Sequence, residues 1–102
     1  MPKGDGGHAR NAERVVRRIV TIRNERGLHA RAAARFVKLA ARFDAEVSVA
    51  KDGAVVSGLS IMGLMMLAAG PGSAIEIRAT GADAEEAIAA LDHLIANKFH
   101  EE

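Results

Sequence analysis

The sequence predicts an α+β domain in which one four-stranded antiparallel sheet carries three helices on one face, an open-faced β-sandwich. Apolar residues alternate in four short segments, which is typical of strands with one buried face. Three other segments carry apolar residues at helical spacing or between helix start and stop signals. Their order along the 102 residues is β-α-β-β-α-β-α, and a chain of this length fits one domain.

The first residues differ in composition from the rest of the chain. Residues 1–14 contain three glycines and few apolar side chains, which predicts a flexible tail, and residues 15–102 are predicted to form the domain. Five of the fourteen basic residues lie within residues 1–18, so the remainder is slightly acidic. This charge balance, with phenylalanine as the only aromatic residue, argues against nucleic acid as a partner.

The first strand and the first helix are predicted from two different periodicities. In residues 17–23, Val20 and Ile22 alternate with Thr21, which predicts a strand. Residues 24–28 then form a loop, and residues 30–43 follow helical spacing with one apolar and one basic face. The apolar positions are Ala33, Phe36, Val37, Ala40 and Phe43, and the basic positions are Arg31, Arg35, Lys38 and Arg42.

A hairpin is predicted next. Val47 and Val49 mark the second strand, and Val55 and Val56 mark the third. Between them, residues 52–53 are Asp-Gly, the pair favoured in two-residue hairpin turns.

The second helix is short and unusually apolar. Ser60 is a good N-cap for the apolar residues 61–69, and residues 70–72, Gly-Pro-Gly, end the segment. A helix of this length has one buried face, so some of these apolar side chains must be exposed. We expect Ile61, Met62 and Met65 to form a docking patch, because methionine adapts to different partners.

The last strand and the last helix complete the order. Ile75 and Ile77 alternate with Glu76, which predicts the fourth strand. Asp83 and Glu86 match the pattern of a capping box before a helix. The apolar positions of that helix are Ala87, Ile88, Leu91, Leu94 and Ile95.

The candidate functional residue is His29, in the segment Gly-Leu-His-Ala-Arg at residues 27–31. It occupies the expected N-cap of the first helix, where a better capping residue would be more stabilising, and such sacrifices favour a chemical role. Neutral imidazole is a nucleophile, and the free backbone amides of Ala30 and Arg31 together with the Arg31 side chain would hold a phosphoryl group placed on it. Arg35 and Lys38 are expected to orient an acidic partner.

Other chemistries find little support in the sequence. His8, His93 and His100 are interpreted as surface residues, because they lie in the tail, at a polar position of the last helix and two residues from the C-terminus. None of them has metal-ligand spacing with another. The chain has no cysteine, and His29 has no accompanying carboxylate pair, metal cluster or nucleotide loop. We therefore expect a carrier protein without cofactor or metal, which is not itself an enzyme. Without a membrane-length apolar stretch or a signal peptide, the expected location is the cytoplasm.

Three motifs in this order resemble the HPr family, the histidine-containing phosphocarriers of bacterial phosphotransferase systems. They are residues 27–31, the segment Ser-Ile-Met-Gly-Leu-Met at residues 60–65, and residues 81–87 at the start of the last helix. The resemblance covers residues 17–99.

The resemblance implies a fold and a set of partners. It implies the strand order 1-4-2-3, phosphorylation of His29 at Nδ1 by Enzyme I with phosphate derived from phosphoenolpyruvate, and transfer onward to an Enzyme IIA domain. Arg31 matches the family's active-centre arginine, and Ser60 matches the serine that HPr kinase/phosphorylase modifies in some bacteria. A monomer without contact to membranes is expected.

One departure from the family pattern concerns the branch. Many members have proline after the arginine, where this chain has Ala32. The alanine-rich version is similar to the nitrogen-related regulatory branch, so sugar transport and nitrogen regulation both stay open. The alternative class is a small ferredoxin-like regulatory or RNA-binding module, although the strands lack exposed aromatic residues for base stacking.

Overall fold

The structure is a computed structural model that describes residues 14–101, so the predicted tail at residues 1–14 lies almost wholly outside the described part. Its elements follow the predicted order, with one additional turn after the last helix. The strands are β1 (Val16–Thr21), β2 (Glu46–Lys51), β3 (Ala54–Ser57) and β4 (Ala74–Thr80), and the helical elements are α2 (Ala30–Ala40), α3 (Ile61–Met66), α4 (Ala84–Ala96) and the η1 turn (Lys98–His100).

The four strands form one antiparallel sheet in the order β1-β4-β2-β3, as the resemblance implied. β4 lies between β1 and β2, with Ile75 opposite Val20 and Ile77 opposite Val49. Asp52 and Gly53 connect β2 to β3, and both have positive φ angles, which suits the tight turn that Asp-Gly predicts.

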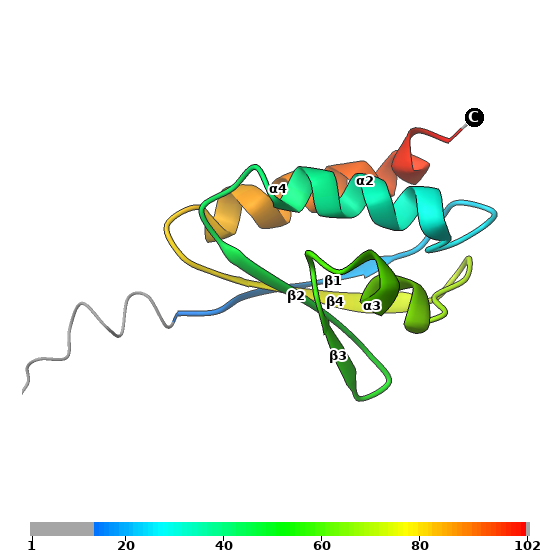
Figure 1. Ribbon diagram of the computed structural model, residues 1–102, viewed down its shortest axis with the longest axis horizontal. Helices are drawn as coiled ribbons and strands as arrows, with labels where there is room; N and C mark the ends of the chain where they lie inside the picture. The colour runs from blue at the N-terminus through cyan, green and yellow to red at the C-terminus, as the bar shows by residue number, and fades with distance from the viewer. Residues whose placement is uncertain (1–13, 102) are drawn as a thin grey trace, which may run out of the picture.

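The helices cover one face of the sheet (Figure 1), and α2 and α4 lie side by side above it. The predicted alternation is confirmed in β4, where Ile75 and Ile77 are buried toward the helices, and in β2, where Val47 and Val49 are buried. On the opposite face Ile19 is exposed. The sheet therefore has one dry and one solvated face, the open-faced sandwich that the alternation predicts.

Three predicted boundaries extend too far. β1 ends at Thr21, although Ile22 continues the pairing through its amide, which donates to the Ser73 carbonyl at 2.8 Å. The predicted helix at residues 30–43 ends at Ala40, and Phe43 packs against the core from the following turn. The predicted helix at residues 61–69 ends at Met66. Ala68 has a φ of +53°, which a right-handed helix does not allow.

The predicted capping box of the last helix is wrong. Asp83 is the N-cap of α4, but its side chain makes no capping hydrogen bond. Instead, its Oδ2 accepts from the backbone N–H of Asp44 at 2.8 Å, and its own N–H donates to the Asp44 carbonyl at 2.9 Å. Asp83 therefore joins the loop before α4 to the loop before β2, a tertiary contact that competes with the local cap.

Candidate functional site

The loop before α2 fixes the position of His29. Gly27 has a φ of +66°, and a Cβ at this residue would lie 2.3 Å from the carbonyl oxygen of Ala69. Only glycine permits this close approach at this backbone conformation. The Leu28 amide then donates to the same carbonyl at 2.9 Å, and the Leu28 side chain is buried. His29 follows as the N-cap of α2 in an extended conformation.

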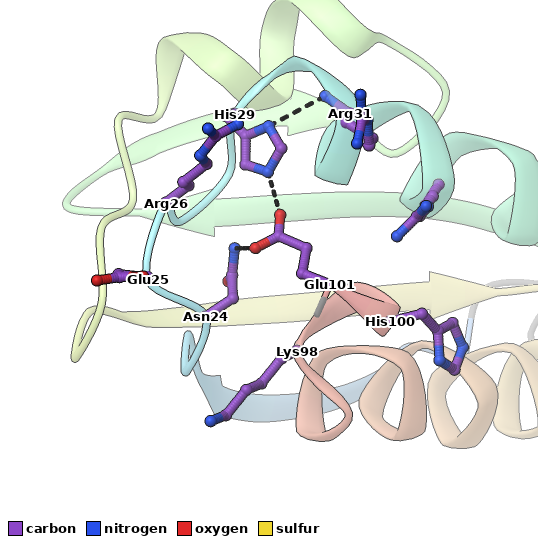
Figure 2. Close-up of a pocket in the computed structure, with 9 residues that line it drawn as sticks. Asn24, Glu25, Arg26, His29, Arg31, Lys98, His100 and Glu101 are labelled. Atoms are coloured by element: carbon purple, nitrogen blue, oxygen red, sulfur yellow. Dashed lines mark hydrogen bonds and ion pairs between the residues drawn. The ribbon is translucent and has the colours of Figure 1, made fainter.

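Each ring nitrogen of His29 has a different partner (Figure 2). The backbone N–H of Arg31 points to Nδ1 at 3.3 Å, and Nε2 is hydrogen-bonded to the Glu101 carboxylate. In the neutral ring, Nδ1 is thus the acceptor and Nε2 carries the proton. The lone pair of Nδ1 faces the N-terminus of α2, where the first amides of the helix have no intrahelical partner.

Glu101 is itself held in place from the other side. Its second oxygen, Oε1, accepts from Asn24 Nδ2 at 3.2 Å, and the same amide group donates to the Gly27 carbonyl at 2.8 Å. The hydrogen bond to His29 lowers the pKa of the Glu101 carboxyl; burial opposes this, and the bond from Asn24 and the nearby charges of His29 and Arg26 add to it. The Glu101 carboxyl is therefore ionised next to the imidazole at neutral pH.

The surroundings of His29 are mainly basic. A hollow of about 540 Å³ lies in front of the ring. Figure 2 shows Arg26 and Arg31 near His29, whereas Glu25, Lys98 and His100 point away from it. This arrangement favours a small anion beside Nδ1. The residues that line the hollow are Asn24, Glu25, Arg26, His29, Arg31, Arg35, Lys98, His100 and Glu101.

The basic side chains predicted on one face of the first helix differ in exposure and in hydrogen bonding. Arg31 and Lys38 are exposed, as a docking role requires. Arg35 is only half exposed, and its guanidinium donates a hydrogen bond to the carbonyl of Phe99. Arg35 therefore holds the segment after α4 in place, and its role in steering a partner stays a prediction.

The predicted apolar patch on α3 is accessible. Ile61, Met62 and Met65 are 41%, 69% and 40% exposed, and α3 lies beside α2 (Figure 1). Leu64, on the other side of α3, is buried in the core. Met66, which the predicted patch does not include, is also exposed. Ser60 caps α3 as predicted, because its hydroxyl accepts from the Gly63 N–H at 2.9 Å.

The remaining histidines lie apart from Nδ1 of His29. His93 is on the exposed side of α4, where Nδ2 of Asn97 lies 3.1 Å from its Nε2. His100 lines the hollow but points away from His29, and His8 lies outside the described residues.

Among residues 14–101 no three His, Asp or Glu side chains are grouped as metal ligands would be. No helix in the same part of the chain has the length and apolarity needed to cross a membrane.

Sequence reasoning missed three residues of the site: Asn24, Arg26 and Glu101. Arg26 is next to the motif at residues 27–31, and its charge was a usable signal. Glu101 is 72 residues away from His29 along the chain. The only sequence signal for it was the aromatic side chain of Phe99, two residues before it, whose burial brings Glu101 back to the start of α2.

Comparisons with known proteins point to one family. A family model described as the PTS HPr component phosphorylation site matches residues 16–97. The chain is 47% identical over 87 residues to the phosphocarrier protein HPr of Cupriavidus necator, which covers 85% of this chain and 98% of that protein. It is 43% identical over 84 residues to the phosphocarrier protein NPr of Shewanella violacea, covering 82% and 92%.

A solved structure is similar as well. The crystal structure of an HPr from Thermoanaerobacter tengcongensis matches with a TM-score of 0.81 and 45% identity, covering 85% of this chain and 98% of that chain.

Proposed function

Because this chain belongs to the HPr family of phosphocarrier proteins of the phosphotransferase system, we propose that His29 accepts the phosphoryl group on Nδ1 from phosphoenolpyruvate-charged Enzyme I and passes it to an Enzyme IIA protein. Proteins of this family carry a phosphoryl group between partners and are not enzymes. The family membership thus favours the phosphocarrier over the alternative of a ferredoxin-like or RNA-binding module.

The orientation of the His29 ring carries this proposal. The Nδ1 lone pair attacks phosphorus, the new P–N bond forms, and the bond to the donor breaks with its electron pair leaving on the donor atom. The proton on Nε2 stays in its hydrogen bond to Glu101, so the ring needs no proton transfer during the step. The positive charge that develops on the ring lies next to the Glu101 carboxylate.

The start of α2 supplies the groups that hold the phosphoryl oxygens. The backbone amides of Ala30 and Arg31 belong to the first turn of the helix, where N–H groups and the helix dipole favour an anion. The exposed guanidinium of Arg31 adds a positive charge with the fork geometry that suits phosphate. Ala32 adds one more N–H donor, which proline at this position would remove.

The two partners use one face in this proposal. Ile61, Met62 and Met65 form the apolar patch on α3, and Arg31 and Lys38 are exposed basic side chains of the neighbouring helix α2. Donor and acceptor must each bring their own phosphoryl site to Nδ1, so both dock over the same area. A monomer in the cytoplasm fits this alternating use of one surface.

Ser60 is the proposed regulatory site on that face, modified by HPr kinase/phosphorylase. It is partly exposed and directly precedes the exposed side chains of Ile61 and Met62. A phosphate there would add about −2 charge at the edge of an apolar patch. We expect the charge to hinder docking of an acidic partner and to add a desolvation cost, without unfolding α3.

The experiment is labelling with phosphoenolpyruvate and a cognate Enzyme I. Wild-type protein should gain one acid-labile, base-stable phosphoryl group, and His29→Ala should gain none. His93→Ala is the matched control, because it removes an exposed histidine on another helix and should label fully. Labelling of the His29→Ala protein would overturn the proposal.

Transfer onward identifies the branch. Phosphorylated protein is mixed in turn with Enzyme IIA proteins of the sugar and nitrogen branches, and loss of label from His29 is followed over time. The physiological acceptor should remove the label fastest. No transfer to any Enzyme IIA would show that the acceptor belongs to another class.

A further inference from the structure

Asn24 stands out in the core because it is the one polar residue that is fully buried within residues 14–101, at 1% exposure. An apolar side chain would fill this place without losing hydrogen bonds to water. The Asn24 amide instead donates to two acceptors from different parts of the chain, the Gly27 carbonyl and Glu101 Oε1. It therefore joins the loop that carries His29 to the segment that follows α4.

That segment is held firmly against its own backbone preference. Lys98, Phe99 and His100 have φ angles of +57°, +56° and +60°, in the left-handed region that costs energy for residues other than glycine. Two anchors maintain the conformation: the Phe99 side chain is fully buried, and Arg35 donates to the Phe99 carbonyl. The strained turn brings Glu101 back across the start of α2, where its carboxylate is hydrogen-bonded to both Asn24 and His29 (Figure 2).

The resulting chain of contacts decides which ring nitrogen of His29 is free. A carboxylate accepts hydrogen bonds and donates none, so Nε2 must carry the proton in this arrangement. Asn24 orients the carboxylate by occupying its other oxygen with a donor. A histidine that is free to rotate or to exchange tautomers would present Nδ1 as an N–H for part of the time, and that nitrogen would then be no nucleophile.

We propose that Asn24 and Glu101 are a positioning pair that keeps Nδ1 of His29 unprotonated and aimed at the start of α2, ready for the incoming phosphoryl group. The proposal deepens the phosphocarrier function and rests on it. Neither residue touches the phosphoryl group; both act through the His29 ring, much as a buried carboxylate orients the histidine of a hydrolase triad.

The main test uses Glu101→Gln. Glu101 accepts from Asn24 with one oxygen and from His29 with the other. Glutamine has a donor nitrogen in place of one of these oxygens, so it cannot accept from Asn24 at one end and from His29 at the other. The readout is the pair of ¹⁵N shifts of the His29 ring at about pH 8.5, where histidine in ordinary surroundings is neutral. We expect the wild-type ring to be almost wholly protonated at Nε2, and the fraction protonated at Nδ1 to rise about threefold in the variant.

The same variant should transfer phosphate more slowly. Losing the charge-assisted contact should reduce the rate of phosphorylation by Enzyme I about tenfold at saturating donor. Glu25→Gln is the matched control, because Glu25 lines the same hollow and carries the same charge but points away from His29. It should change neither the tautomer fraction nor the rate by more than about twofold.

A second variant tests the part played by Asn24. Asn24→Ala removes both donated bonds, and it should raise the Nδ1–H fraction in the same direction as Glu101→Gln. If the two residues act as one unit, the double variant should be no slower than the slower single variant, instead of showing the product of both effects. The tautomer is read on folded protein, so a loss of stability in Asn24→Ala is measured separately by its melting curve.

The outcomes separate the two proposals. An unchanged His29 tautomer in Glu101→Gln and Asn24→Ala, with wild-type labelling of His29, would overturn the positioning pair and leave the phosphocarrier function intact. A shifted tautomer together with labelling of the His29→Ala protein would overturn the function and retain the contact. Equal effects of Glu25→Gln and Glu101→Gln would show a general charge effect and would also overturn the pair.

Discussion

The N-termini of α2 and α3 are capped in different ways. At α3, the Ser60 hydroxyl accepts from the N–H three residues later at 2.9 Å, so the cap is complete within four residues of sequence. At α2, the His29 ring accepts from Arg31 at 3.3 Å, a longer contact, and depends on Glu101 for the rest of its position. The cap of α3 is formed by neighbouring residues, whereas the cap of α2 depends on a contact with a distant segment of the chain.

The two caps differ in what they contribute: stability at α3 and, in the proposed function, a reactive nitrogen at α2. Ser60 satisfies its helix in the way that best stabilises it. His29 caps poorly but keeps a nucleophilic nitrogen at a helix start, and residues far away in sequence compensate for the weak local geometry. In the proposed function, the helix start that serves chemistry is thus supported from elsewhere in the fold.

The largest expected effect comes from replacing Arg31, at the start of α2. Arg31→Ala should slow phosphorylation of His29 about 10- to 100-fold, because one fixed charge on the transferring group is lost. The side chain is exposed, so stability should fall by only about 0.5 kcal/mol. Quench-flow labelling and a melting curve measure the two quantities. A large loss of stability with unchanged transfer would make Arg31 a structural residue.

A charge at the start of α3 should have the next largest effect. Ser60→Asp should slow phosphorylation about tenfold at subsaturating Enzyme I, mainly by weakening association. Met62→Asp should act similarly on donor and acceptor, because its side chain is 69% exposed and its replacement should leave the fold intact. Titration of the rate against partner concentration tests this. Equal rates for wild type and both variants would remove α3 from the docking face.

Replacing the two caps compares their contributions to stability directly. Ser60→Ala should lower the free energy of unfolding by about 1 kcal/mol, the usual value for a serine N-cap. His29→Ser should stay within about 0.5 kcal/mol of wild type, because a better local cap offsets the lost contact with Glu101. Urea unfolding gives both values. A larger loss at position 29 than at position 60 would contradict the division of roles.

The smallest expected effect is that of low pH. Acid should protonate Glu101 beside the start of α2 and leave the Ser60 cap of α3 unchanged. The folded pKa of Glu101 lies below its ordinary value of 4.5, so its contribution to stability is present above about pH 4.5 and is lost as pH falls through the lower folded value. The Asn24 side-chain amide signal should change in this window, and the Gly63 amide at the α3 cap should not.

His29→Ala is the control for the acid titration. It removes the largest cause of the lowered pKa and should move the Glu101 titration toward the ordinary value. Arg26 is the other charged group whose proximity lowers this pKa. The titratable side chains that also line the hollow are Glu25, Arg31, Arg35, Lys98 and His100. An unchanged Glu101 titration in His29→Ala would contradict the assigned contact.

The sequence determined most of the fold and the central residue of the site. Three predictions rest on local signals: the alternation in β2 and β4, the Asp-Gly turn and the Ser60 cap. The structure contains all three, because the tertiary contacts agree with the local preference of the chain. The signal for His29 was local too: a poor capping residue at a helix start, followed by Arg31.

Tertiary structure alone decided the rest of the site. Several features depend on contacts between distant segments. They are the helix ends, the bond of Asp83 to the loop before β2, the bond of Arg35 to Phe99, and the approach of Asn24 and Glu101 to His29. No periodicity records such contacts. They arise when burial of Phe99 and the left-handed turn after α4 bring a carboxylate from the end of the described chain to a ring 72 residues earlier.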